Sequence, residues 1–201
     1  PEIYPGVEAG APRPNNGTAR AFLARLYLDW GGCPIKETSK YQEAANSAKK
    51  VIDNHESHGF GLVEDLDDLW TLEHRFNKES VFTIEHCVSC IQGGNYKTGK
   101  VGNPGEFGGW WETFSEIKFF ETFPENHRKQ ATFITDPMIE DPHSNPSNGP
   151  TKNWTTFISQ QNPLLAKITG KGDIPRSSLE NERSDYMMGC GEVLLIFAVA
   201  A

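Results

Sequence analysis

The sequence predicts a mainly α fold in which helical hairpins are combined with long irregular loops. Two segments near the start of the chain place apolar and small residues at the spacing of an α-helix, and a short turn rich in Gly and Pro separates them. The 201 residues include 19 Gly and 13 Pro, which is more than most globular chains contain and indicates extended loops. A chain of this length can bury a substantial hydrophobic core.

The two segments predict an antiparallel helical hairpin. The first helix is predicted over residues 18–30, where the apolar positions at helical spacing are Ala21, Phe22, Leu23, Leu26, Tyr27 and Trp30. The second is predicted to start with a capping box at Ser39 and to break at residues 55–59. Its apolar face consists of Tyr41, Ala44, Ala45, Ala48, Val51 and Ile52, and the small alanines permit close packing. Such a hairpin is about the size of one tetratricopeptide repeat of ~34 residues, and its packing partners must come from outside these residues or from the apolar run 192–201.

The middle of the chain changes character. Residues 79–86 alternate as a short strand does, and residues 93–109 contain seven Gly among seventeen positions. A helix is predicted over residues 112–120, and residues 136–150 indicate a polar loop. We expect one domain over residues 1–201, and the two ends of the sequence lead us to expect a piece of a longer chain.

Charge and known motifs exclude several classes of function. The formal charge of −8 gives no basic surface for nucleic acid or an anionic membrane, and the terminal apolar run is shorter than the roughly 20 residues that span a bilayer. Residues 94–101 approach a phosphate-binding loop, but Val101 stands where the Mg²⁺-binding Ser or Thr is needed. Neither a G-x-S-x-G nor an H-E-x-x-H motif occurs, so the sequence carries no hydrolase signature of these kinds.

The four cysteines give a weak indication of a metal site. Cys87 and Cys90 follow His86, but a zinc site needs four ligands and no second Cys-x-x-Cys occurs. Buried free thiols are the favoured interpretation, and we expect neither a metal nor a cofactor.

Aromatic residues in the Gly-rich segment indicate a ligand-binding surface. A sugar ring presents an apolar C–H face that stacks on an aromatic ring, while nearby polar side chains bind its hydroxyl groups. The candidate platforms are Tyr96, Trp110, Trp111 and Trp154, and the candidate hydroxyl partners are Asn95, Asn103 and Glu106. The alternative is that Trp110 and Trp111 divide, with one ring in the core and the other outside.

Several segments also resemble a known family in their order along the chain. They are residues 17–28, 41–53, 59–62, 66–70, 77–84, 123–128 and 191–198. Taken together, these segments resemble the SusD/RagB family of nutrient-binding outer-membrane lipoproteins of glycan-using Bacteroidetes. The sequence departs from the family pattern at Val199, where the family has Glu, and at His127, where an Asp is common.

The resemblance implies a SusD-like fold, with tetratricopeptide-like helix pairs as scaffold and irregular insertions that build a glycan site. It implies non-catalytic binding of an oligosaccharide or polysaccharide at the bacterial cell surface for nutrient uptake. It further implies a SusC-like TonB-dependent transporter as partner, and an outer-membrane location through a lipidated Cys that is not among these residues. The alternatives are a helical-repeat scaffold that binds proteins, and a glycoside hydrolase that uses Glu106 and Glu112.

Overall fold

The computed structural model describes most of the chain in two compact units. The described residues are 13–89, 94–95, 101, 105, 109–110, 112–135, 153–158, 161–169 and 182–201. Unit 1 comprises Pro1–Glu64, Phe76–Ile84 and Asp185–Ala201, and unit 2 comprises Asp65–Arg75 and Glu85–Ser184. Each unit has a hydrophobic core of its own. The single domain expected from the sequence stays a prediction.

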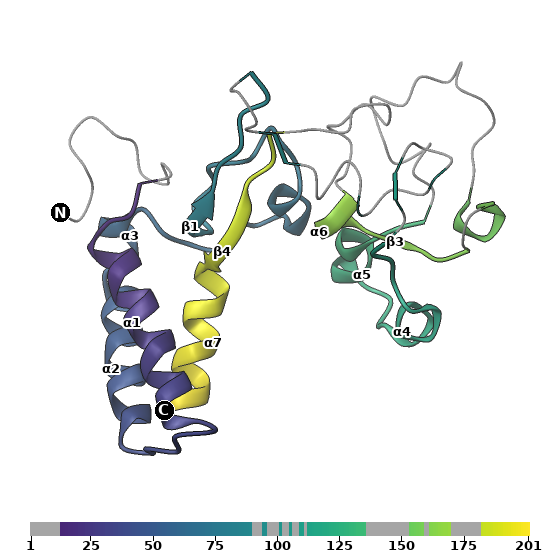
Figure 1. Cartoon of the computed structure of the whole chain (residues 1–201). Helices are drawn as coiled ribbons and strands as arrows, with labels where there is room; N and C mark the ends of the chain where they lie inside the picture. Colours follow the sequence, from purple (N-terminus) through teal and green to yellow (C-terminus); the bar gives the residue numbers. More distant parts are fainter. Residues whose placement is uncertain are drawn as a thin grey trace. The chain divides into compact units, whose positions relative to one another are not determined.

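Unit 1 is built on three helices that pack along one another (Figure 1). They are α1 (Asn16–Gly31), α2 (Lys40–Asp53) and α7 (Cys190–Ala200). The predicted hairpin is confirmed, and the terminal apolar run supplies the packing partner that it requires. The core consists of Ala21, Ala24, Ala48, Val51, Phe60, Val81, Met188, Cys190, Val193 and Ile196.

The helices of the hairpin approach closely because small residues lie between them. Ala24, Ala44 and Ala48 are completely buried, as the alanine-rich face predicted. A Cβ atom added at Gly31 would lie 2.8 Å from the ring of Tyr41, so only glycine fits at this contact. The larger residues of α1 that share the helical spacing, Leu23, Leu26 and Trp30, are exposed instead. The buried face of α1 is therefore set by its smallest side chains rather than by its most apolar ones.

The capping box of the hairpin lies at α1 and not at α2. The Asn15 side chain accepts a hydrogen bond from the Thr18 amide over 3.0 Å, and the Thr18 hydroxyl accepts one from the Asn15 amide over 3.2 Å. The capping box predicted at Ser39 is wrong. Ser39 has helical backbone angles, φ −58° and ψ −24°, because a preceding turn leads directly into α2, and its hydroxyl makes no capping bond.

The helix α2 ends at Asp53, next to the predicted break at residues 55–59, and a separate single turn of helix follows it. It is α3 (His55–His58), and Gly59, with φ 77°, ends it in the left-handed conformation that favours glycine. The side chain of His58 is only 3% exposed and packs beside Phe60.

A short antiparallel strand pair completes unit 1. The strands are β1 (Ser80–Ile84) and β4 (Asp185–Gly189), which pair Ile84 with Asp185 and Ser80 with Gly189. The predicted strand at residues 79–86 is confirmed over its centre. Figure 1 shows β4 running directly into α7.

The Glu79 side chain holds the start of α7. Its carboxylate accepts hydrogen bonds from the Gly191 amide over 2.8 Å and from the Val63 amide over 3.2 Å. The Glu79 carbonyl accepts a third bond from the Cys190 amide over 2.9 Å. A carboxylate at a helix N-terminus is favourable both as a cap and for its charge. Burial and, to a lesser extent, the Glu79 charge raise the pKa of the Cys190 thiol to about 11.

Unit 2 combines short elements around a second core. The helices among its described residues are η1 (Leu66–Leu69), α4 (Ile117–Thr122), α5 (His127–Thr132), η5 (Trp154–Thr156) and α6 (Ala166–Thr169). The strands β2 (Phe133–Ile134) and β3 (Leu164–Leu165) pair antiparallel. The core consists of Ile134, Phe157, Leu164 and Ala166, against which Trp70 and Trp154 pack.

The helix predicted at residues 112–120 is wrong over its first five residues. The amides of Glu112 and Thr113 donate to the carbonyl of Val101, and the amide of Ser115 donates to the carbonyl of Pro163. Because these amides already have partners elsewhere in the chain, α4 starts only at Ile117. Its N-cap is Glu116, whose side chain accepts from the Phe119 amide over 2.7 Å.

The cysteines depart in part from the expectation of buried free thiols. Cys190 is free and buried, and Cys33 is free but exposed. Cys87 is disulfide-bonded, so it is not a free thiol. Among the described helices, none is long and apolar enough to cross a bilayer.

Candidate functional site

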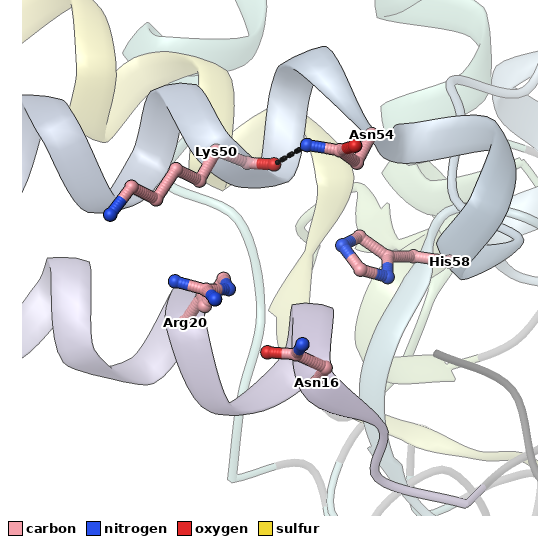
Figure 2. Close-up of a pocket in the computed structure, with 5 residues that line it drawn as sticks. All are labelled: Asn16, Arg20, Lys50, Asn54 and His58. Carbon is pink, nitrogen blue, oxygen red and sulfur yellow. Dashed lines mark hydrogen bonds between the residues drawn. The ribbon is translucent and has the colours of Figure 1, made fainter. Parts of the chain in front are cut away.

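A polar pocket lies in unit 1 at the end of the hairpin where α1 begins (Figure 2). Its volume is about 300 Å³, and it is lined by Asn16, Arg20, Lys50, Asn54 and His58. Asn54 Nδ2 donates to the Lys50 carbonyl over 2.8 Å, which fixes that side of the pocket. None of the ligand-binding residues predicted from the sequence is among these five.

The predicted ligand-binding residues that the structure describes lie in unit 2. They are Asn95, Trp110 and Trp154. The other four predicted residues, Tyr96, Asn103, Glu106 and Trp111, lie outside the described residues. The assignment of all seven to a ligand site stays a prediction.

Trp110 has the exposure that a stacking platform requires. Its side chain is 57% exposed, in the irregular segment that precedes α4. An indole ring presented to solvent offers an apolar face of large area together with one N–H donor. A flat apolar ligand face can therefore bind at Trp110 without displacing any part of the core of unit 2.

Trp154 contributes to the packing of unit 2. Its ring lies edge-to-face against Phe120, with ring centroids 5.9 Å apart, and it packs on the second core. Its amide donates to the Thr135 carbonyl over 2.9 Å, and the Asn153 side chain caps the short helix that it begins. The partly exposed remainder of the ring is the part available to a ligand.

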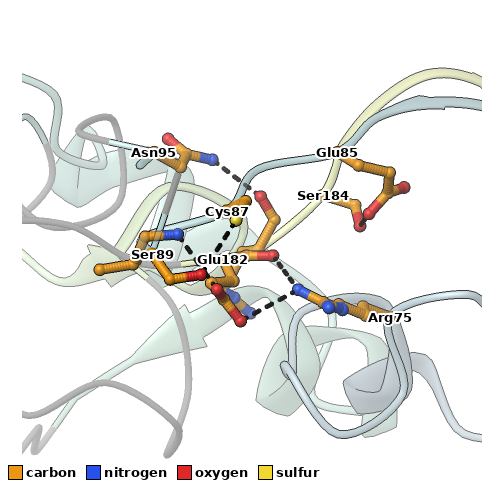
Figure 3. Close-up of polar contacts among 9 residues, drawn as sticks. Arg75, Glu85, Cys87, Ser89, Asn95, Glu182 and Ser184 are labelled. Atoms are coloured by element: carbon orange, nitrogen blue, oxygen red, sulfur yellow. Dashed lines mark hydrogen bonds and ion pairs between the residues drawn. The ribbon is translucent and has the colours of Figure 1, made fainter. Parts of the chain in front are cut away.

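Asn95 is buried and forms a hydrogen bond within the protein (Figure 3). Its side chain is 3% exposed, and its Nδ2 donates to the Arg183 carbonyl over 3.1 Å. Asn95 therefore connects the segment that carries the aromatic residues to the segment that leads into β4. This contact gives Asn95 a structural role beside the predicted one.

A group of polar contacts around Glu182 fixes the same region of unit 2 (Figure 3). The Glu182 carboxylate accepts from the Val88 amide over 3.0 Å, and Arg75 Nη1 donates to the Glu182 carbonyl over 3.0 Å. Ser184 Oγ donates to Glu85 Oε2 over 2.6 Å. Residues 75–88 are thus joined to residues 182–184, about a hundred positions later in the chain, by hydrogen bonds that involve side chains.

Sequence reasoning missed an aromatic cluster on α4 and its neighbours. Phe119, Phe120 and Phe123 surround Phe133 at ring centroid separations of 5.1–5.8 Å, all edge-to-face. Phe119 is 52% exposed, whereas Phe133 is buried. The signal in the sequence is the close spacing of three Phe in residues 119–123.

The acidic and metal-binding side chains of the described part of the chain give no metal centre. Within these residues, no group of three or more His, Cys, Asp or Glu side chains is placed to hold an ion. His127 lies 3.1 Å from Asp65 and His74 lies 3.0 Å from Asp68, as exposed pairs. Such surface pairs contribute little to stability.

Comparison with known proteins identifies the fold. No family model and no curated protein matches the sequence. A solved SusD superfamily protein from Parabacteroides distasonis is similar over 95% of this chain and 40% of its own, with a TM-score of 0.70 and 18% identity. Surface glycan-binding protein A from Bacteroides uniformis is similar over 98% of this chain and 40% of its own (TM-score 0.71, 17% identity).

A third solved structure is surface glycan-binding protein A from Bacteroides thetaiotaomicron in complex with laminarihexaose. It is similar over 94% of this chain and 43% of its own, with a TM-score of 0.69 and 17% identity. The chain thus spans about two fifths of the length of these proteins. At this identity the likeness is one of fold, and it agrees with the order of segments in the sequence. The chain has the fold of the SusD superfamily.

Proposed function

We propose that this chain is part of a glycan-binding protein that captures oligosaccharides at the bacterial cell surface for nutrient uptake. The observation that carries the proposal is the likeness in fold to surface glycan-binding proteins, one of them solved with laminarihexaose. The aromatic residues of unit 2 supply the chemistry, because exposed rings bind the apolar faces of sugars. Trp110 is the leading candidate since its ring is largely exposed.

The remaining predicted residues extend the proposed site along the same segment of sequence. Tyr96 and Trp111 would add stacking rings, and Asn103 and Glu106 would bind hydroxyl groups. Trp154 would contribute the exposed part of its ring. A few stacked rings and hydrogen bonds must offset the ordering of ligand and side chains, so we expect weak to moderate affinity.

Isothermal titration against a panel of oligosaccharides, with laminari-oligosaccharides included, tests the proposal. Trp110→Ala should weaken binding about tenfold, which corresponds to a loss of about 1.4 kcal/mol. The matched control is Trp30→Ala in unit 1, which removes another partly exposed Trp and should leave the affinity unchanged. If the wild-type chain and Trp110→Ala bind the same oligosaccharide with equal affinity, Trp110 is not part of the site. An absence of binding to every member of the panel refutes the function.

The proposed function is to bind glycans without cleaving them. Incubation with the ligands that bind in titration should release no new reducing ends over many hours. If new reducing ends still form after the protein has been purified a second time, the proposal is contradicted and the glycoside hydrolase alternative is favoured.

The proposed partner is a SusC-like TonB-dependent transporter in the outer membrane. The physical reason is that captured sugars must cross this membrane, and weak binding permits their release to a transporter. Affinity purification of the full-length protein from detergent-solubilised outer membranes should recover such a transporter. Recovery of the full-length protein only from the soluble fraction would contradict both the location and the partnership.

A further inference from the structure

The polar pocket at the start of α1 in unit 1 has an unusual charge for this chain. Arg20 and Lys50 line it together with Asn16, Asn54 and His58, and no carboxylate is among these five residues. The chain as a whole carries 27 acidic against 19 basic residues. A pocket lined by two cations and no anion is therefore a local exception to a negative surface.

The geometry of the two helices brings these groups together. Arg20 lies one turn after Asn16 on α1, and Lys50 lies on α2 one turn before Asn54, the residue that follows the end of that helix. Each of these two segments thus presents one cation and one amide to the same pocket, and Figure 2 shows the four side chains across from one another. His58 closes the end of the pocket from α3.

The two cations are not neutralised by neighbouring carboxylates. Neither Arg20 nor Lys50 forms an ion pair within the part of the chain that the structure describes. Adjacent cations do: Lys49 Nζ lies 2.7 Å from Asp53, and Arg25 is paired with Glu192. The positive charges of Arg20 and Lys50 are therefore available to a ligand, whereas those of Lys49 and Arg25 are paired with carboxylates.

The pocket walls are held in place by contacts that leave the two cations uninvolved. Asn15 Nδ2 donates to the His58 carbonyl over 2.9 Å, which connects the start of α1 to α3. A Cβ atom at Gly17 would lie 2.6 Å from the His58 ring, so the backbone of α1 packs directly on that side chain. These contacts fix the side of the pocket formed by α1 and His58 before a ligand binds, which lowers the ordering cost on that side, whereas Lys50 and Asn54 on the other side are exposed to solvent.

We propose that this pocket binds an oxyanion, that is, a sulfate, phosphate or carboxylate group. Arg20 supplies a planar guanidinium that binds two oxygens at once, and Lys50 supplies a second positive charge. Asn16 and Asn54 contribute amide donors. A volume of about 300 Å³ accommodates an inorganic anion or the acid group of one sugar residue. The site differs from the proposed aromatic site and does not depend on it.

Titration of the ¹⁵N-labelled chain with sodium sulfate, at constant ionic strength set with sodium chloride, tests the proposal. The amides of the five lining residues should shift saturably. Arg20→Gln and Lys50→Gln should each weaken binding at least about tenfold, as loss of a charge-assisted hydrogen bond predicts. Lys49→Gln, which removes the same charge at the next position, should leave the affinity within about twofold because Lys49 is paired with Asp53.

Two results overturn the proposal. One is a shift that grows linearly with sulfate and does not saturate. The other is an equal weakening by Lys49→Gln and Lys50→Gln, which would show a general charge effect. Circular dichroism of each variant shows whether the helices are intact. Lys50→Arg keeps the positive charge and should therefore retain binding.

Glucuronate and glucose distinguish the sources of the anion. Displacement of sulfate by glucuronate and not by glucose shows that the pocket accepts a sugar acid. If sulfate binds and neither displaces it, a sugar acid is refuted as occupant and the ligand is an inorganic anion. Trp110→Ala should bind sulfate as the wild type does, so failure of the glycan proposal and failure of this one are separable.

Discussion

Removal of the Glu79 side chain should destabilise unit 1 more than any ordinary surface substitution. Glu79→Ala leaves the amides of Gly191 and Val63 without their acceptor. The Gly191 bond acts as the side-chain cap of α7, and loss of such a cap costs about 1–2 kcal/mol. The longer Val63 bond adds about 1 kcal/mol. We therefore expect the free energy of unfolding to fall by about 2–3 kcal/mol.

Urea unfolding followed by far-ultraviolet circular dichroism measures this loss, because that signal reports chiefly the helices of unit 1. The matched control is Glu64→Ala, which removes an exposed carboxylate of the same unit and should cost less than about 0.5 kcal/mol. Glu79→Gln retains an oxygen acceptor but not the charge at the helix N-terminus, so its loss should be intermediate. A loss in Glu79→Ala no larger than in Glu64→Ala would refute the reasoning.

Three further predictions concern packing and thiol chemistry. Gly17→Ala places a methyl group 2.6 Å from a buried ring and should cost about 1–3 kcal/mol by urea unfolding, whereas Gly105→Ala meets no atom within 4 Å and should cost far less. Equal losses of unfolding free energy in the two variants would show that α1 and α3 move apart without a penalty. Iodoacetamide should label the exposed Cys33 in the native protein, whereas Cys190, which is 8% exposed and has a raised thiol pKa, should be labelled only on unfolding. The pKa of the Cys190 thiol is about 11 in the folded chain, against an ordinary value of 9.0. The stability that the protonated thiol contributes is therefore present below pH 9.0 and lost as the pH rises through 11. Urea unfolding at several pH values across this range measures the loss.

Local patterns were sufficient to predict the hairpin of α1 and α2 and the apolar run of α7, but not the single turn of α3. The alanines of α2 and the apolar run of α7 each carry their signal within a few turns of helix. The position of the capping box was not predictable in this way, because residues 39–42 carry the usual pattern with Gln at its fourth position, whereas residues 15–18 have Thr18 there. The outcome depends on the conformation of the preceding chain, which is extended at Asn15 and helical at Ser39.

Contacts between distant segments account for what the sequence did not reveal. The strand β4 exists because it pairs with β1, which lies about a hundred positions earlier in the chain. Residues 112–116 are not helical because carbonyls of Val101 and Pro163 take their amides. In the candidate site, Trp110 and Trp154 are the same residue type, yet the first is exposed and the second packs against Phe120. No local pattern distinguishes the two.

The pairing of β1 with β4 also determines how much sequence unit 1 can carry between its strands. Ile84 and Asp185 are neighbours in the ladder, so the strands would be the arms of a simple hairpin if the hundred residues between them were a tight turn. For a flexible loop of that length, closure costs about 3 kcal/mol more chain entropy than a four-residue turn, and each further doubling adds only about 0.6 kcal/mol. This is an upper limit for residues 85–184, because they form most of unit 2, which has a core of its own. Insertions and deletions in this segment therefore change the closure entropy of the helical scaffold very little. The segment that carries the aromatic residues can therefore diversify in length and composition while the three helices stay unchanged.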